Sequence, residues 1–359
     1  MKNKKNKKFV YENTNIITRV RIPENRDLIK GLRLNRNERV ENFPQYLLSK
    51  IFKKIKNYEL GKYPDQNLIY KHLSNYLKIK NENILLSSGI DGSLKSIFEI
   101  FLKPNDKIAY LSPSYAMYAV YSKIFKIKIL PIPYDTDFNL EKKKLFECIK
   151  KGIKILFLPN PNQPIEDNLS LEDLEKLVKL CKRHKVLMVV DEAYHMYGSQ
   201  TASSLIKKYE NLIILRTFSK SFGLPSLRLG YILSNKNMIK ILDTYRLSYE
   251  SNLLVDKVAI YFLQNKKLVN NYIIKVKQGR DFIKNELKKI NLRVIGGRSN
   301  YLLVIFNNDK EYNKAYKSLL THKIYVKGGY KGILKNGILF TCGPKKFMKR
   351  LLAIIKKNI

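Results

Sequence analysis

The 359-residue chain is poor in several features that mark particular protein classes. Its three cysteines, Cys148, Cys181 and Cys342, are far apart, and neither they nor the four histidines show a disulfide or metal-ligand spacing. No apolar run approaches the roughly 18–20 residues of a membrane span, and the N-terminus lacks the apolar segment of a signal peptide. We therefore predict a cytoplasmic protein with no metal site and no membrane association, and a disordered basic tail over residues 1–8.

Acidic residues are also scarce, with 30 Asp and Glu against 69 Lys and Arg, which gives a net charge of +39. Such an excess of positive charge raises the question of nucleic-acid binding. The lysines are scattered through every helix-like segment, however, and no helix-turn-helix, zinc-finger or RNA-recognition signature is present. We predict no specific nucleic-acid partner, although the charge alone supports loose binding to polyanions in vitro.

Between residues 84 and 233, short apolar runs alternate with helix-like segments. Strands are predicted at 84–87, 107–111, 127–132, 153–158, 186–190, 212–215 and 231–233. Ser170, with Asp173 three residues later, predicts the start of a helix that runs to His184. Such alternation predicts an α/β fold, with a largely parallel sheet covered by helices on both faces.

The pattern changes from about residue 238. Two long helix-like stretches, 238–264 and 269–290, precede a shorter region in which strands and helices alternate. The strands of that region are predicted at 292–295, 301–306, 324–327 and 337–341. This change predicts a second, smaller domain at the C-terminus.

The segment from Leu215 to Gly230 places one lysine, Lys220, between two predicted core strands. A buried lysine is costly unless it is paired or neutral, and a neutral amine is the nucleophile that Schiff-base chemistry requires. The alternative is that Lys220 lies on an exposed loop, as most lysines do. This segment alone leaves both interpretations open.

Polar and aromatic groups follow nearly every predicted strand, at the sheet edge where parallel sheets bind ligands. A glycine turn at 89–92 opens a helix whose N-terminus favours a phosphate. The other strand ends supply an aromatic ring, amides, a carboxylate, a phenol, hydroxyls, an amine and a guanidinium. These are Tyr115, Asn162, Gln163, Asp191, Tyr194, Thr217, Ser219, Lys220 and Arg228. Each is weak evidence alone, but together they are the groups that pyridoxal phosphate requires.

With these motifs the chain resembles the fold-type I, class I/II aminotransferases, and within them it is most similar to the histidinol-phosphate aminotransferase group. The similarity runs from Leu34 to about Gly343. It is carried by the lysine motif RTFSKSFGLPSLRLGY at 216–231 and by DEAY at 191–194. Further matches are YPD at 63–65, SPSYAMY at 112–118 and LNRNE at 34–38.

The resemblance implies a mostly parallel seven-stranded sheet sandwiched by helices over residues 61–239. It also implies a small α+β domain built from residues 9–60 and 240–359. The protein would be a homodimer with shared active sites, because Tyr63 would reach the partner subunit's cofactor.

The resemblance also implies a role for each site residue. Lys220 would form the aldimine and move the proton, Asp191 would pair with the pyridinium, and Tyr194 would bind the phenolic oxygen. Tyr115 would stack on the ring. The phosphate would be held by Gly89, Ile90, Asp91, Thr217, Ser219 and Arg228.

The chain departs from the family pattern at two places. QPIE at 163–166 stands where the family has Asn-Pro-Thr-Gly, so either Gln163 or Asn162 would bind the cofactor's phenolic oxygen. Leu339 stands where the family has the arginine that clamps the substrate carboxylate, and Lys327 aligns with its second substrate-side arginine. The predicted substrate-binding residues are Asn35, Arg36, Arg298 and Lys327.

We predict a transaminase that exchanges an amino group between an amine and a 2-oxo acid. The amine is either an amino acid or a molecule with a phosphate or phosphonate, such as histidinol phosphate or aminoethylphosphonate. The cofactor motifs do not exclude a decarboxylase or lyase of the same fold, similar to the threonine-phosphate decarboxylases. A non-catalytic relative that only binds the cofactor is a third possibility.

Overall fold

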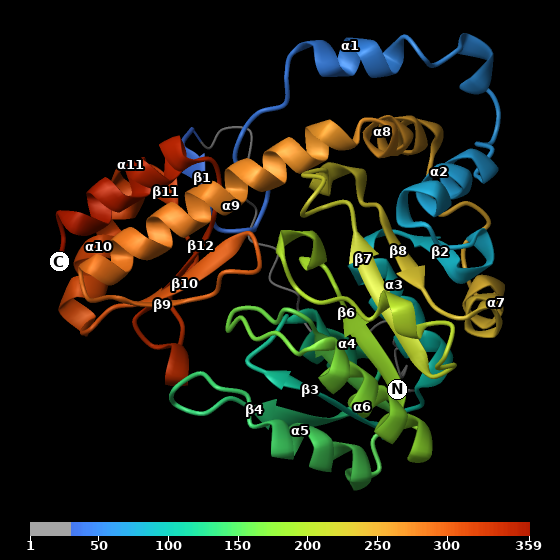
Figure 1. The fold of residues 1–359 in the computed structure, drawn as a ribbon, viewed down its shortest axis with the longest axis horizontal. Coiled ribbons are helices and arrows are strands. Elements are labelled where there is room, and N and C mark those ends of the chain that lie inside the picture. Colours follow the sequence, from blue (N-terminus) through green and yellow to red (C-terminus); the bar gives the residue numbers. More distant parts are fainter. Residues whose placement is uncertain (1–29) are drawn as a thin grey trace, which may run out of the picture.

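The computed structural model describes residues 30–359, so the predicted tail at 1–8 and the following stretch to residue 29 lie outside it. None of the helices in this described part is both long and apolar enough to cross a membrane. The chain folds around one large sheet, with smaller sheets formed mainly by its C-terminal third (Figure 1).

The large sheet has seven strands in the order β2-β8-β7-β6-β5-β3-β4. All are parallel except β8, which runs antiparallel to both β2 and β7. The strands are β2 (Ile84–Ser87), β3 (Lys107–Ser112), β4 (Lys128–Pro133), β5 (Ile155–Pro159), β6 (Leu187–Asp191), β7 (Leu212–Thr217) and β8 (Gly230–Leu233). The predicted α/β fold and largely parallel sheet are confirmed.

Two hydrophobic cores lie on the opposite faces of this sheet. Successive side chains of a strand point to opposite faces. Along β5, Leu156 and Leu158 therefore pack into one core, while Ile155 and Phe157 pack into the other. Burial on both faces explains why these strands are continuous apolar runs in the sequence.

Helices cover both faces. One core takes residues from α3 (Gly89–Phe101), α4 (Met117–Ile124) and α7 (Lys236–Thr244), and the other takes residues from α5 (Lys142–Cys148) and α6 (Leu171–Arg183). Ser170 caps α6 as predicted, because its side chain accepts a hydrogen bond from the Asp173 backbone N–H. The N-terminal region adds α1 (Tyr46–Phe52) and α2 (Asn67–Leu77), and α1 lies along the top of the molecule in Figure 1.

The single antiparallel strand decides which residues meet at the carboxyl edge of the sheet. The first residue of β8, Gly230, lies opposite the last residues of two strands, Ser87 of β2 and Thr217 of β7. Arg228 precedes Gly230 by two residues and therefore lies at the same edge as the ends of β2 and β7. A parallel β8 would have placed Arg228 at the far edge.

The C-terminal third forms a separate group of elements. The prediction of one helix over 238–264 is wrong, since α7 ends at Thr244 and α8 (Leu253–Gln264) begins after an irregular segment. The long helix α9 (Lys266–Lys289) runs diagonally from α8 to the C-terminal elements in Figure 1.

The C-terminal sheet consists of β9 (Arg293–Ile295), β10 (Tyr301–Ile305) and β12 (Gly337–Thr341), all antiparallel in the order β12-β10-β9. Helices α10 (Asp309–Thr321) and α11 (Lys345–Lys356) accompany it. The short β1 (Leu32–Arg33) and β11 (Ile324–Tyr325) pair in parallel and join the N-terminal segment to this region.

A buried ion pair ties the end of β6 to β7. The Arg216 guanidinium lies 2.9 Å from the Glu192 carboxylate, and both side chains are almost completely buried. Thr201 donates its hydroxyl to this carboxylate, and the Ala202 backbone N–H donates to it at 2.7 Å. The pair therefore links the residue after β6 to the second-last residue of β7, and so stabilises the carboxyl ends of both strands.

We expect the substitution Arg216→Met to lower the free energy of unfolding by about 3–5 kcal/mol, because it leaves the Glu192 carboxylate buried without a cation. The double variant Arg216→Met/Glu192→Leu should lose less than the single variant, since it removes both charges. The urea midpoint followed by circular dichroism measures this, and a double variant as unstable as the sum of both single variants would contradict it.

Candidate active site

Lys220 lies in the loop that follows β7, and its side chain is largely enclosed by protein. Its Nζ donates hydrogen bonds to two backbone carbonyls of the N-terminal segment, those of Arg36 at 3.1 Å and Asn37 at 3.4 Å. The pKa of the amine is lowered to about 8, mainly by burial, with Glu38 opposing the shift and Arg228 adding to it. At neutral pH the Lys220 amine therefore has a much larger neutral fraction than an ordinary lysine has.

Asp191 is the last residue of β6, and only 7% of its surface is exposed. Its carboxylate accepts hydrogen bonds from the Tyr118 hydroxyl and the Ala193 backbone N–H, both at 3.0 Å. Burial raises its pKa to about 6. Both hydrogen-bond donors are neutral, so this buried carboxylate is suited to a cationic N–H group of a ligand.

Tyr194 joins the N-terminal segment to the loop after β5. Its hydroxyl accepts a hydrogen bond from Asn37 Nδ2 at 2.9 Å and donates one to Gln163 Oε1 at 3.0 Å. Sequence reasoning missed Asn37 and named its neighbour Asn35. The LNRNE motif contained the signal, since Asn37 is its second asparagine.

Asn162 and Gln163 have different surroundings. Asn162 is fully buried, and its Nδ2 donates to the Pro113 and Ile165 carbonyls and to the Tyr134 hydroxyl. Its amide oxygen accepts from Ser114 at 2.6 Å. Its amide is therefore fully used in joining the segments that follow β3, β4 and β5, whereas Gln163 contacts the Tyr194 hydroxyl.

The start of α3 forms a small cradle with Arg228. Gly89 has a φ of +72°, and a Cβ at that position would lie 3.2 Å from the Arg228 guanidinium. Arg228 itself has a φ of +49° and lies 3.6 Å from the Asp91 carboxylate. The unpaired N–H groups of a helix N-terminus and a guanidinium together favour an anion, and a side chain at position 89 would fill the space.

Ser219 and Tyr115 border the same cradle. The Ser219 backbone N–H donates to the Thr217 hydroxyl at 3.0 Å, which fixes the loop directly before Lys220. The Tyr115 hydroxyl donates to Asp91 at 2.7 Å, and its ring packs edge-to-face on Tyr118, the residue that binds Asp191. The predicted aromatic ring therefore lies between the cradle and the buried carboxylate.

These residues fit pyridoxal phosphate. The structure brings together an amine of lowered pKa, a buried carboxylate that accepts hydrogen bonds from two neutral donors, and an anion cradle with a glycine at a φ of +72°. The amide oxygen of Asn300 adds a further feature, because it is buried and has no hydrogen-bond partner among residues 30–359. Asn300 Nδ2 donates to the same Asn37 carbonyl that Lys220 contacts, so its oxygen is an unused acceptor beside the lysine.

Leu339 lies in the middle of β12, directly opposite Leu303 of β10 on one side. On its other side it forms a bridge with Lys327, through backbone hydrogen bonds of 2.8 and 2.9 Å. Opposite residues of antiparallel strands project to the same face. Lys327 is thus the neighbouring cation on the face where Leu339 stands.

That face is directed towards the cofactor residues. Tyr301 and Thr341 lie two residues along the same strands, so they share the face. The Tyr301 ring lies 5.1 Å from the Tyr194 ring, and the Thr341 hydroxyl accepts from the Asn37 backbone N–H at 2.8 Å. Lys327 is exposed as a residue, yet desolvation by the surrounding protein lowers the pKa of its amine.

Of the other predicted residues, Arg36 contacts Lys220 through its backbone carbonyl, which accepts a hydrogen bond from Nζ. Arg298 and Arg36 are exposed, and Arg298 is held through its backbone N–H by the Glu166 carboxylate. Tyr63 is 80% exposed and stacks on Tyr249, with ring centroids 4.6 Å apart. Among the described residues there is no cluster of His, Cys, Asp or Glu suited to a metal ion.

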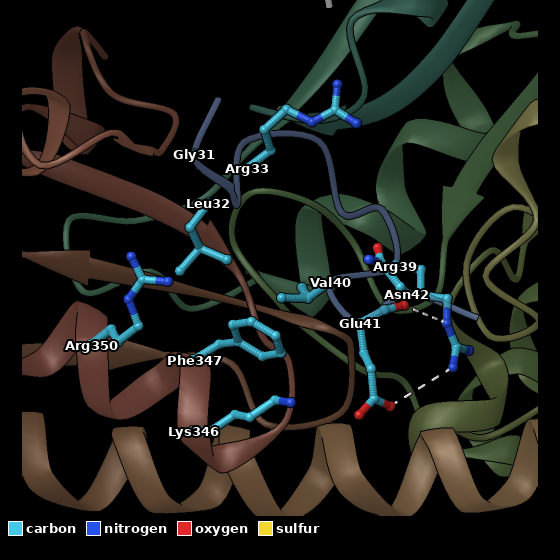
Figure 2. Close-up of a pocket in the computed structure, with 10 residues that line it drawn as sticks. All are labelled: Gly31, Leu32, Arg33, Arg39, Val40, Glu41, Asn42, Lys346, Phe347 and Arg350. Carbon is cyan, nitrogen blue, oxygen red and sulfur yellow. Dashed lines mark hydrogen bonds and ion pairs between the residues drawn. The ribbon is translucent and has the colours of Figure 1, made fainter. Parts of the chain in front are cut away.

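A cavity of about 770 Å³ lies outside this constellation, between the N-terminal segment and the start of α11 (Figure 2). Its lining includes Arg33, Arg39, Lys346 and Arg350, but none of the predicted cofactor residues. Figure 2 shows the basic side chains spread around its rim rather than converging on one point. We therefore assign the chemistry to the sheet edge and not to this cavity.

The chain matches known proteins over most of its length. The family model for aminotransferase class I and II matches residues 40–355. A histidinol-phosphate aminotransferase of Thermoanaerobacter pseudethanolicus is 32% identical over 82% of this chain and 83% of the relative. That of Buchnera aphidicola subsp. Schizaphis graminum is 30% identical over 83% of this chain and 86% of the relative.

Solved structures agree. The histidinol-phosphate aminotransferase from Clostridium acetobutylicum superposes with a TM-score of 0.81 at 26% identity, over 91% of this chain and 98% of that one. The enzyme from Sinorhizobium meliloti in complex with pyridoxal-5'-phosphate has the same fold, with a TM-score of 0.82 at 21% identity over 91% of both chains. The chain belongs to the class I and II aminotransferase family, and its cofactor is pyridoxal 5'-phosphate.

Proposed function

We propose that this aminotransferase acts on an amine that carries a phosphate or phosphonate and no α-carboxylate, with glutamate and its 2-oxo acid as the second pair. The observation that carries the proposal is Leu339, a fully buried apolar side chain on the strand face that also carries Tyr301 and Thr341, with Lys327 paired beside it. A guanidinium binds a carboxylate through two parallel hydrogen bonds. An ammonium is a point charge, so it binds a phosphate as readily as a carboxylate. Histidinol phosphate is the first candidate, because the similar curated relatives carry that name.

The roles of the site residues are part of this proposal. The bound cofactor supplies an electron sink for the pair of electrons left at the substrate Cα. Asp191, as a carboxylate, holds a proton on the ring nitrogen, and Tyr194 donates its hydroxyl to the phenolic oxygen with Gln163 beside it. Lys220 attaches the cofactor and afterwards carries the proton between the substrate and the cofactor. Gly89, Ile90, Asp91, Thr217, Ser219 and Arg228 hold the phosphate, and Tyr115 covers the ring.

We also propose the division into a cofactor domain, residues 61–239, and a small domain from the N- and C-terminal segments. A homodimer is supported by exposed apolar side chains in the segment between α1 and α2 and in the segment before α8, which include Leu60, Tyr63 and Leu247. Large exposed apolar patches mark association surfaces. The cytoplasmic location stays a prediction from the three free cysteines.

The amine of Lys220 should titrate near pH 8 in the cofactor-free enzyme. Only the neutral amine reacts, so its acetylation by trace acetic anhydride should rise about tenfold per pH unit below pH 8 and then level off. Mass spectrometry of the peptide that contains Lys220 measures the rate against N-acetyl-lysine, whose amine has a pKa of roughly 10.4. A rate that rises in parallel with this standard up to pH 10 would show that Lys220 is not desolvated.

The substitution Lys327→Ala should raise the KM for histidinol phosphate by about 10- to 150-fold, because a charge-assisted contact is worth about 1.5–3 kcal/mol. Lys331→Ala, in the same loop, is the matched control. The half-reaction is measured as conversion of the bound cofactor from its aldehyde to its amine form. Unchanged KM in Lys327→Ala would refute the assignment and leave Arg298 and Arg36 as the remaining cations.

The same half-reaction tests the reaction type. Glutamate should convert the cofactor to its amine form, although with a weaker affinity than in an enzyme with the clamping arginine. Release of carbon dioxide without that conversion would favour a decarboxylase. The L-threonine-O-3-phosphate decarboxylase of Porphyromonas gingivalis has the same fold, with a TM-score of 0.76.

Light scattering should give a mass of twice the 42.1 kDa chain. The double substitution Leu60→Glu/Leu247→Glu should shift the protein towards the monomer, whereas Leu320→Glu on α10 should not. Mixing the inactive variants Tyr63→Ala and Lys220→Ala should restore activity, because a mixed dimer contains one site with both residues intact. No recovery in a mixture proven to exchange subunits would show that each site is complete within one chain.

A further inference from the structure

Glu166 is a carboxylate at the position where the family pattern has the glycine of Asn-Pro-Thr-Gly. It lies in the loop that follows β5, three residues after Gln163. The carboxylate is mostly enclosed, and burial raises its pKa despite two hydrogen bonds that act in the opposite direction. The turn itself needs no side chain at this position. The role of this mostly enclosed carboxylate therefore has to come from its contacts.

Both oxygens of Glu166 bind one short segment of the C-terminal region. Oε1 accepts from the Arg298 backbone N–H at 2.6 Å, and Oε2 accepts from the Ser299 hydroxyl. Residues 296–300 lead directly into β10, and Gly296 and Gly297 at their start have φ values of +113° and +151°. Two successive glycines in that region of φ leave the segment with little conformational restraint of its own.

Helix α9 holds the same segment from the other side. Arg280 donates to the Ser299 carbonyl at 3.0 Å, and Lys284 donates to the Gly296 carbonyl. These cations also partly offset the charge of Glu166. The segment is thus held between helix α9 and the Glu166 side chain of the loop after β5.

The clamp continues into the active site. Asn300 donates to the Asn37 carbonyl at 3.1 Å, and Lys220 donates to the same carbonyl. Asn37 in turn donates to the Tyr194 hydroxyl, which donates to Gln163, three residues from Glu166. These hydrogen bonds, together with the chain between Arg298 and Asn300 and between Gln163 and Glu166, form a closed ring that begins and ends in the loop after β5.

We propose that Glu166 is a positioning residue that fixes residues 296–300 of the C-terminal region against the loop after β5 and thereby holds Asn37, Tyr194 and Gln163 in register around Lys220. Neighbouring contacts support the loop but do not replace this carboxylate. The Tyr301 hydroxyl donates to the Asn162 carbonyl and so anchors the residue that follows the segment. The Arg298 backbone N–H and the Ser299 hydroxyl are bound by Glu166 instead. The proposal rests on the proposed cofactor placement only for the change expected in the absorbance of the bound cofactor.

The test compares Glu166→Gly, Glu166→Gln and Ser299→Ala with Glu210→Gly, which removes an exposed carboxylate from the loop before β7. Hydrogen exchange in the cofactor-free enzyme should become about tenfold faster in the peptide 296–304 of Glu166→Gly, because local opening follows the loss of the two hydrogen bonds. Glu166→Gln keeps an acceptor for Arg298 and should fall between this variant and the parent. Glu210→Gly should match the parent.

The second readout is the pH titration of the bound cofactor's absorbance. Loss of register around Tyr194 should move its midpoint upwards by about 0.5 pH unit in Glu166→Gly, with a smaller shift in Glu166→Gln. Unchanged exchange in Glu166→Gly would overturn the proposal, and so would faster exchange with an unchanged midpoint, which would make Glu166 merely structural. If Glu166→Gly does not fold, Glu166→Gln and Ser299→Ala provide the same test. None of these measurements depends on which amine is the substrate.

Discussion

Two opposite charges placed in the interior, on Asp191 and Lys220, are the constraint on which the site depends. Taking a carboxylate or an ammonium out of water is costly, and proteins respond by shifting the pKa towards the neutral form. The pKa of Asp191 rises to about 6 and that of Lys220 falls to about 8. Each therefore gains from a ligand that supplies what is missing, a cationic N–H for Asp191 and an aldehyde for Lys220. The surrounding network of neutral donors and carbonyls holds both in position without cancelling either.

The arrangement of the large sheet brings these charges to one edge. Parallel strands β6 and β7 end there with Asp191 and with the loop that carries Lys220, and their ends are joined by the buried Arg216–Glu192 pair. The antiparallel β8 returns Arg228 to the same edge. The cost of burying the pair is consistent with a role in register, since an apolar pair would fill the same space with less desolvation. The site is thus a product of strand direction as much as of residue type.

Much of this could be predicted from the sequence because the signals are local. Continuous apolar runs predict buried parallel strands, and the motif around Lys220 is specific. What could not be predicted depends on contacts between distant segments. The direction of β8, the contact of Asn37 with Tyr194 and the clamp on residues 296–300 leave no periodic pattern. The break between α7 and α8 was missed although it has a local signal, because Asn252 is a residue type that starts helices and its side chain caps α8 by accepting from the Val255 backbone N–H.

The chain departs from the family pattern at Leu339 and at Glu166, and both departures affect how the C-terminal sheet is joined to the cofactor region. In an enzyme with an arginine at position 339, the substrate carboxylate itself would help to join the C-terminal sheet to the cofactor region. With leucine there, that ligand-dependent contact is absent, and a fixed contact from Glu166 to Arg298 and Ser299 joins the same two regions in its place. A fixed contact does not discriminate between substrates, so under the proposed function selection falls to Lys327. An ammonium at that position would select for charge rather than for carboxylate geometry. The proposal of a phosphate-bearing amine, in place of a range of amino acids, rests on that difference.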